Sequence, residues 1–300
     1  MERILEYQDA SPLLEDAEAL RRQVDEDGFA CFRGLLPRDA VIELRRLVLQ
    51  IFAQRGWLAP GTELLDGVAD KAIDQVESYA SNGADLAAYQ AVYRLEEFHR
   101  LAHHPAIVGL FEKLFGESVF VHPRNIARLM APHKDAVHTP PHQDFIYVQG
   151  TKATYTCWFA LGDCPRELGG LSVMRATHKG DILPVRDAVG AGGRTVILDG
   201  VEREWVEGDL QTGDVVIFHS QTVHRSLPNK TQDRIRLSCD YRYQPLSLPV
   251  EEKSLEPHVG LMTWEEAYEG WTADDLKYYW RDLKLQRTDF DMALLKTEGD

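Results

Sequence analysis

The sequence is poor in positive charge. Its 33 Lys and Arg residues stand against 48 Asp and Glu residues, which gives a formal net charge of -15 at pH 7. Proteins that bind nucleic acids obtain much of their affinity from cationic contacts to phosphate. The charge deficit therefore argues against a nucleic-acid partner.

Cysteine is also scarce, and long apolar runs are absent. The four cysteines include no C-x-x-C pair, which excludes a zinc ribbon, a thioredoxin-type redox pair and a disulfide scaffold. No stretch reaches about 18 consecutive apolar residues, and acids stand near Met1 where a secretory signal needs basic residues. These absences predict a cytoplasmic protein that does not enter a membrane. Nothing in the sequence specifies an oligomeric state.

Helical periodicity marks the first third of the chain. Apolar residues recur at helical spacing after Pro37, and similar segments run from Ala84 to Leu101 and from Pro105 to Leu114. After Pro249 the pattern becomes helical again, and Thr263 to Glu266 matches a capping box. We therefore expect helices on both sides of the central region.

Between these helical parts the pattern changes to short runs rich in β-branched and aromatic residues. The clearest runs are Tyr155 to Leu161, Leu171 to Met174, Asp214 to His219 and Ile235 to Tyr243. Such runs, separated by Gly, Pro, Asn and Asp, predict a sandwich or barrel of antiparallel strands. No linker or repeat divides the chain. We expect one domain over 1–300, with a helical N-terminal part (1–118), a β core (119–248) and a helical C-terminal part (249–300).

The Gly-rich stretch from Val189 to Arg194 resembles a phosphate-binding loop only in composition. It lacks the preceding strand and following helix that such a loop requires. The sequence therefore predicts a surface excursion here.

The strongest chemical pattern is His142-Gln143-Asp144. In a β-strand, residues two apart project from the same face, so His142 and Asp144 can offer a nitrogen and an oxygen to one point. His224, at the end of the run that begins at Gly213, is the best third ligand. Two histidines and one carboxylate on one face of an octahedral ion leave open positions, as in non-haem Fe(II) oxygenases.

An open iron site needs an electron source to activate dioxygen. After His224 the chain turns through Leu227-Pro228-Asn229 and enters a strand near Arg234. A guanidinium from that strand can bind a distal carboxylate through two parallel hydrogen bonds. This pattern predicts a keto acid that chelates iron at one end and binds arginine at the other.

Several segments in order resemble one family. They are DGFACFRGLL from Asp27, HQD from His142, CWFAL from Cys157, GDVVIFHSQTVHRSLPN from Gly213 and RIRLSCDYRYQ from Arg234. Together they resemble the phytanoyl-CoA dioxygenase family of Fe(II)/2-oxoglutarate oxygenases. The resemblance implies a mainly β fold with flanking helices around a double-stranded β-helix, the cupin-like jelly roll.

The resemblance also implies roles for individual residues. The implied iron(II) ligands are His142, Asp144 and His224. Arg234 is the implied anchor for the distal carboxylate of 2-oxoglutarate, because the family's arginine lies seven residues before an aromatic that is Tyr241 here. Arg236 projects to the same face and is a rival anchor. The residues implied around the co-substrate are Gln143, Trp158 and Ser226, although Gln143 would need a local twist or bulge to reach it.

Two details qualify the resemblance. The usual Gly-Ser-His appears here as Ala176-Thr177-His178, which affects a turn and not a ligand. Related halogenases carry a small residue in place of the ligating carboxylate. Because Asp144 is present, the sequence favours hydroxylation or another oxidation over halogenation.

The predicted function is therefore an iron(II)- and 2-oxoglutarate-dependent dioxygenase. It would use dioxygen to oxidise a small-molecule C–H bond, as in secondary metabolism, and release succinate and CO2. Two alternatives stay open: a cupin-like metal enzyme that does not use 2-oxoglutarate, and a non-catalytic β-barrel that binds a ligand. Tyr147 and Tyr155 could line the substrate space or simply pack. Specificity is expected in the loops from Lys179 to Val206 and in the C-terminal part.

Overall fold

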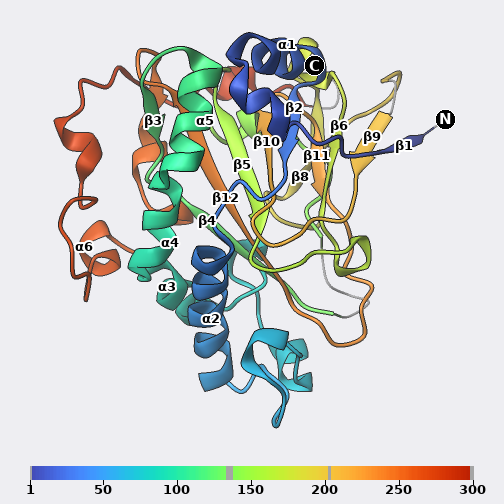
Figure 1. The fold of residues 1–300 in the computed structure, drawn as a ribbon, viewed down its shortest axis with the longest axis vertical. Helices are drawn as coiled ribbons and strands as arrows, with labels where there is room; N and C mark the ends of the chain where they lie inside the picture. The colour runs from blue at the N-terminus through green and yellow to red at the C-terminus, as the bar shows by residue number, and fades with distance from the viewer. Residues whose placement is uncertain (1, 133–137, 202–203, 298–300) are drawn as a thin grey trace.

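The strands form two main sheets with the helices on one side (Figure 1). The computed structural model describes residues 2–132, 138–201 and 204–297. One sheet has the order β2-β10-β5-β12-β3, with β4 also paired to β12, and the other has the order β1-β9-β6-β11. The first contains β2 (Phe29–Phe32), β3 (Val119–Val121), β4 (Ile126–Met130), β5 (Tyr155–Ala160), β10 (Val215–His219) and β12 (Arg236–Pro245). The second contains β1 (Arg3–Glu6), β6 (Leu171–Met174), β9 (Glu204–Glu207) and β11 (His224–Ser226).

The two sheets pack face to face. One apolar cluster joins Trp158 and Phe218 of the larger sheet to Val173 and Val206 of the smaller one. Apart from the parallel pair β1 and β9, the strands in both sheets pair antiparallel. This arrangement is the predicted sandwich, and its two inner faces enclose the space where the candidate site lies.

The helices cover the outer face of the larger sheet (Figure 1). They are α1 (Ala17–Asp27), α2 (Arg38–Gln54), α3 (Leu86–Tyr93), α4 (Glu96–Arg100) and α5 (Pro105–Phe115). The segment predicted from Ala84 to Leu101 is divided, since Arg94 and Leu95 separate α3 from α4. The C-cap of α5 is Gly116, whose φ of 72° suits glycine. No helix within the described ranges is long and apolar enough to cross a bilayer.

Strand β12 shows why the sheet has one polar and one apolar face. Its odd-numbered residues from Leu237 to Tyr243 are buried in the core beneath the helices. The hydroxyl of Tyr241 donates to the Phe98 carbonyl at 2.6 Å, and that of Tyr243 donates to the Ala102 carbonyl at 2.7 Å. The even-numbered residues, which point to the inner face, are Arg236, Ser238, Asp240, Arg242 and Gln244. The two-residue period of one strand therefore provides both the helix-packing surface and a polar interior.

Both terminal parts differ from the expected helical character. The N-terminal part contributes β1 and β2 to the sheets. In the C-terminal part, the capping box at Thr263 is confirmed, but α6 (Trp264–Ala267) ends after one turn. The described remainder consists largely of 3-10 turns and the small pair β13 (Val250–Glu251) and β14 (Arg287–Thr288). Aromatic packing replaces helix formation there, since Trp264 and Trp271 lie against the ring of His99.

Two short strands complete the described structure near the site. They are β7 (Val185–Asp187) and β8 (Arg194–Val196), which pair antiparallel. The Gly-rich stretch connects them. Val189 is exposed as expected for a surface excursion, but Ala191 is only 5% exposed and faces a cavity. The stretch is therefore partly internal. That residues 1–300 form a single domain stays a prediction.

Candidate active site

The structure brings His142, Asp144 and His224 together in a buried cluster. The two histidines pair through an isolated β-bridge, with each backbone N–H donating to the other's carbonyl at 3.0 Å. Asp144 begins a 3-10 turn (Asp144–Ile146) just after this bridge. Its Oδ1 lies 3.6 Å from Nε2 of His142 and 3.7 Å from Nε2 of His224. One ligand atom from each residue lies within 4.8 Å of the others, so a single ion could contact all three.

Backbone carbonyls fix the orientation of both imidazoles. Nδ1 of His142 lies 2.8 Å from the Pro140 carbonyl, and Nδ1 of His224 lies 3.0 Å from the Thr222 carbonyl. A carbonyl can only accept, so each Nδ1 carries the proton and each Nε2 presents a lone pair to the centre of the cluster. Burial and the neighbouring His142 lower the pKa of His224 to about 3. The neutral imidazole that a metal ion needs is therefore the resting form of His224.

Asp144 is held as a carboxylate by its surroundings. Burial alone would raise its pKa, but the neighbouring Arg242 guanidinium opposes this effect, and the pKa lies well below 3.8. The Thr156 hydroxyl donates to Oδ2 at 2.5 Å, and Nη2 of Arg242 lies 3.3 Å from Oδ1. These contacts orient the carboxylate toward the two Nε2 atoms.

A narrow cavity beside the cluster is lined by the guanidinium groups of Arg236 and of Arg128, which pairs with Asp240 at 2.7 Å. Arg236 is only 2% exposed, and no carboxylate within the described residues lies at ion-pair distance from it. Its Nη1 donates to Ser238 Oγ at 2.5 Å and its Nη2 approaches the sulfur of Met130 at 3.7 Å, while Nε has no partner. A buried cation without an anion is costly, so this cavity is suited to a bound carboxylate.

The structure does not place Arg234 in this cavity. Its side chain is 53% exposed and approaches the carboxylate of Asp233 at 3.9 Å, while its backbone bridges to Val68 ahead of β12. Arg234 and Arg236 are two residues apart and would face the same side of a regular strand, but β12 begins only at Arg236. The role of Arg234 as the anchor stays a prediction, and of the two candidates it is the rival, Arg236, that lines the cavity.

Gln143 also lies away from the expected position. Its side-chain amide donates to the Gln221 carbonyl at 2.7 Å and accepts from the Leu183 backbone N–H at 2.8 Å. Because the bridge at His142 keeps regular alternation, Gln143 points to the opposite side and ties loops together. Gln143 is not among the residues that line the narrow cavity, and its expected contact with the co-substrate stays a prediction.

Trp158 and Ser226 do line the narrow cavity. Trp158 lies on β5 opposite Asp240 of β12, which puts it on the inner face. The Ser226 hydroxyl accepts from the Thr139 backbone N–H at 2.7 Å and keeps its own proton available to another acceptor. Both residues therefore adjoin the space that Arg236 faces.

A wider cavity of about 440 Å³ opens on another side of the cluster and is also lined by His142 and Asp144. Its walls include Arg242 and Arg128 from the inner face, Tyr147, and the Gly-rich loop that connects β7 to β8. Tyr147 thus lines a cavity, whereas Tyr155 packs between Phe115 and His219. Loops from both expected specificity regions reach this space.

Arg242 and Thr156 are the site residues that the sequence analysis missed. Both could have been found from alternation, since Arg242 is six residues after Arg236 and pairs with Thr156 across the strands. Residues on the inner face of two paired strands around a metal cluster are candidates for contacting it.

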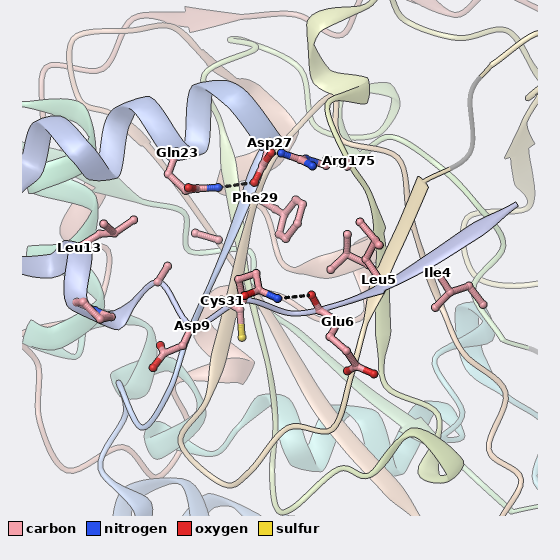
Figure 2. Close-up of a pocket in the computed structure, with 15 residues that line it drawn as sticks. Ile4, Leu5, Glu6, Asp9, Leu13, Gln23, Asp27, Phe29, Cys31 and Arg175 are labelled. Atoms are coloured by element: carbon pink, nitrogen blue, oxygen red, sulfur yellow. Dashed lines mark hydrogen bonds and ion pairs between the residues drawn. The ribbon is translucent and has the colours of Figure 1, made fainter.

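A cavity of about 760 Å³, larger than either cavity beside the cluster, lies elsewhere, between the N-terminal segment, α1 and β2 (Figure 2). Its polar groups bind one another: Asp27 accepts from Gln23 and from Nε of Arg175, the latter at 2.5 Å. The only group of potential metal ligands among the described residues is the His142 cluster. The larger volume therefore does not mark the active site.

One family profile and two named relatives match the sequence of this chain. The profile of the phytanoyl-CoA dioxygenase (PhyH) family matches residues 24–238. The chain is 32% identical to 1-deoxypentalenic acid 11-beta-hydroxylase of Streptomyces arenae, over 81% of this chain and 86% of the relative. It is 26% identical to the peroxisomal phytanoyl-CoA dioxygenase of Rattus norvegicus, over 74% of this chain and 67% of that protein.

Two solved structures show the same fold. The epimerase SnoN, solved with Fe3+, α-ketoglutarate and nogalamycin RO, aligns with a TM-score of 0.57 at 22% identity, covering 78% of this chain and 85% of its own. EctD from S. alaskensis, solved with bound Fe, aligns with a TM-score of 0.52 at 16% identity, covering 95% of this chain and 92% of EctD. At these identities the likeness establishes the fold, and the expected jelly roll is confirmed.

Proposed function

The chain belongs to the phytanoyl-CoA dioxygenase family, and from this premise we propose that His142, Asp144 and His224 hold iron(II) while Arg236 holds 2-oxoglutarate. The protein is an enzyme, a non-haem iron- and 2-oxoglutarate-dependent dioxygenase. What the proposal adds is the assignment of its residues, the type of oxidation and the kind of substrate.

The donor set suits iron(II). Two imidazoles and one carboxylate would leave positions on the ion for a chelating keto acid and dioxygen. The Nδ1–carbonyl bonds and the Thr156 hydroxyl act on the far side of the ligands and keep their donor atoms aimed inward. This support exists before any ion is bound.

The single observation that carries the co-substrate assignment is the buried guanidinium of Arg236, which lines the same cavity as the cluster and has no carboxylate partner among the described residues. A distal carboxylate there would accept charge-assisted hydrogen bonds from Arg236, and Ser226 could add a hydroxyl donor. Trp158 and Phe218 form an apolar wall for the carbon chain between the two ends. This arrangement disfavours a cupin-like enzyme that does not use 2-oxoglutarate, because such an enzyme has no need of the buried cation.

We propose hydroxylation of a small molecule as the reaction. When bound, iron(II) with 2-oxoglutarate supplies an oxidation in which one oxygen atom of dioxygen enters a substrate C–H bond, the other enters succinate, and CO2 leaves. The Streptomyces relative is named as a hydroxylase, which supports this reaction type. The presence of Asp144 supports it as well. A cytoplasmic location belongs to the same proposal and suits four buried free cysteines.

The test is to measure iron binding and succinate formation with Asp144→Ala. Purified protein receives Fe(II) and 2-oxoglutarate without oxygen, the visible absorption of the chelate is recorded, and succinate is measured after air is admitted. We expect Asp144→Ala to reduce both signals by more than about 100-fold, because a ligand is lost and not merely a group behind a ligand. Asp233→Ala, which removes an exposed carboxylate, is the control. Unchanged iron binding in folded Asp144→Ala would contradict the assignment.

A further inference from the structure

We propose that the wider cavity binds substrates through a carboxylate group, and that Arg242 and Arg124 are its anchors. The inference rests on the proposed function, because it concerns the substrate that would face the same iron site. The inference goes beyond the proposed function by naming the chemical class of the substrate and the residues that recognise that substrate.

Arg242 has donors that no described residue uses. The residue is 4% exposed and lines the cavity. Its Nη2 contacts Asp144 at 3.3 Å, but its Nε and Nη1 are buried and have no hydrogen-bond partner within residues 2–132, 138–201 and 204–297. Nε and Nη1 lie on different edges of the planar guanidinium, so each can donate to a separate ligand oxygen. A neutral ligand atom could satisfy one of them, but would leave the positive charge uncompensated.

Arg124 adds a second positive charge to the same wall. Its Nε makes one long hydrogen bond, 3.4 Å, to the Glu256 carbonyl. No ion pair joins Arg124 to a carboxylate within the described residues. The nearby Glu251 carboxylate accepts from the Lys253 backbone N–H at 3.0 Å and so stabilises the turn that begins at Glu251. Arg124 is therefore available to a ligand.

The local charge balance is opposite to that of the whole protein. Three arginines line the cavity, including Arg128, while Asp144 is its one lining carboxylate among the described residues. Arg128 is paired to Asp240 at 2.7 Å. A divalent ion on Asp144 would leave the charge of Arg242 without compensation as well. In a chain with a net charge of -15, such a concentration of positive charge at one buried cavity favours an anionic occupant.

The remaining walls suit a compact apolar molecule. They include Ile126, Val148 and Ala191, and the ring of Tyr147. A volume of about 440 Å³ is in the range of small-ligand pockets, where a few polar groups orient a mostly apolar body. Anchoring the charged end would fix which carbon of that body faces the iron ligands.

Backbone strain is concentrated at the same cavity. Ala80, Ser81 and Val259 line it with φ angles of 48°, 56° and 50°. Positive φ is unfavourable for these residues, most of all for the β-branched Val259. The Tyr79 hydroxyl donates to the Val259 carbonyl at 3.1 Å and joins the two strained segments. Strain of this kind persists where surrounding structure holds a ligand-binding wall in place.

The test compares acids with their own amides. Protein loaded with Mn(II), which supports no turnover, is titrated by calorimetry with and without 2-oxoglutarate. The probes are straight-chain and fused-ring monocarboxylates of about 8 to 20 carbons, each paired with its primary amide. We expect at least one acid to bind about 10-fold or more tightly than its amide, also when 2-oxoglutarate is present.

Three variants assign that preference to residues. Arg242→Met and Arg124→Met should each reduce the preference for the acid about 10-fold, and Arg124→Met should do so without changing Mn(II) or 2-oxoglutarate binding, since Arg124 does not contact the cluster. Arg236→Met removes an equally buried charge from the same face of β12. It should weaken 2-oxoglutarate binding and leave the acid preference unchanged.

The outcomes separate this inference from the proposed function. No preference for any acid, or a preference that survives both Arg242→Met and Arg124→Met, would overturn the carboxylate site. Tighter binding of matched alkyl phosphates than of carboxylates would overturn the ligand class. If Mn(II) or 2-oxoglutarate fails to bind the unaltered protein, the proposed function itself falls. Arg124→Met keeps the test decisive if Arg242→Met does not fold.

Discussion

The two cavities beside the candidate iron site are built from different parts of the molecule. The narrow cavity is lined mainly by the inner faces of strands, including Trp158, Leu171 and Phe218. The wider cavity takes much of its wall from turns and loops outside the sheets, at Ala80, Gly190–Gly193 and Val259. Strands fixed by pairing can hold a co-substrate common to a family, whereas loops can differ between members. The division implies that recognition of 2-oxoglutarate and of the substrate can change independently.

One strand nevertheless serves both cavities. β12 provides Arg236 to the narrow cavity and Arg242 to the wider one, six residues apart on the same face. At the usual rise of a strand, this separation is about 20 Å, which leaves room for the cluster between the two guanidinium groups.

The largest expected difference concerns Arg236. Arg236→Met should raise the 2-oxoglutarate concentration for half-maximal succinate formation about 10- to 100-fold, because charge-assisted hydrogen bonds are lost. The fold should persist, since a buried cation without a carboxylate partner contributes little stability. Arg234→Met is the matched control and should stay within about twofold, as expected for a surface change. The reverse ranking of the two variants would restore Arg234 as the anchor.

A change to the shared cluster should affect both cavities equally. Thr156→Val keeps the shape of the side chain but removes the hydroxyl that donates to Asp144 at 2.5 Å. We expect metal affinity to fall about 10-fold, as for other groups that orient a ligand. Thr154→Val, in which a buried hydroxyl bonded to the Thr151 carbonyl is lost, should leave metal affinity unchanged. Equal effects of the two variants on metal titrations would contradict an orienting role for Thr156.

A change in the loop should affect the wider cavity alone. A Cβ at Gly192 would lie 2.5 Å from the Tyr147 hydroxyl, whereas a Cβ at Gly193 meets nothing within 4 Å. Both glycines have positive φ, so Gly192→Ala and Gly193→Ala share a backbone cost of about 1 to 2 kcal/mol. Only Gly192→Ala should move Tyr147, and we expect it to weaken binding of the carboxylate probe about 5-fold with 2-oxoglutarate binding unchanged. Equal probe binding by the two variants would show that Tyr147 does not shape the site.

The smallest expected effect concerns the stability of the scaffold, through the buried His99, which lines neither cavity. Burial lowers the pKa of His99 to about 4, whereas the unfolded chain has the ordinary value near 6.5. Below pH 6.5 the unfolded chain therefore takes up a proton that the folded chain does not, and stability falls as the pH decreases. Between pH 7 and pH 5, His99 should contribute a loss of about 2 kcal/mol. Urea unfolding of the metal-free protein and of His99→Gln at both pH values measures it, and an identical pH dependence would exclude this role.

The sequence was sufficient for much of the core and for the three clustered residues. The spacing of His142 and Asp144, and the position of His224 after an apolar run, predicted residues that the structure brings together. The strands from Tyr155 and Ile235 were predicted to within a few residues because both runs are rich in β-branched and aromatic residues. Alternation also indicated that Gln143 points away, although the family resemblance placed it near the co-substrate.

Other features required the fold. Arg234 and Arg236 share strand parity, so only the position at which β12 begins distinguishes them. The joining of β1 and β2 to the sheets depends on partners more than 170 residues away, at Glu204 and Val215. The short helix after Thr263 is ended by aromatic packing against the helices before the core. Such long-range contacts override local propensity.

The alternation of β12 also limits how the chain can change in length. Insertion of one residue between Arg236 and Arg242 would reverse the facing of the strand on one side of the insertion, so that one of the two guanidinium groups would turn toward the helix-packed core. A single insertion would thus separate the two arginines that now share one face. Related chains should accordingly gain or lose residues in the turn from Leu227 to Asp233 and not between Arg236 and Tyr243. The turn precedes β12, so a change in its length leaves the alternation of the strand intact.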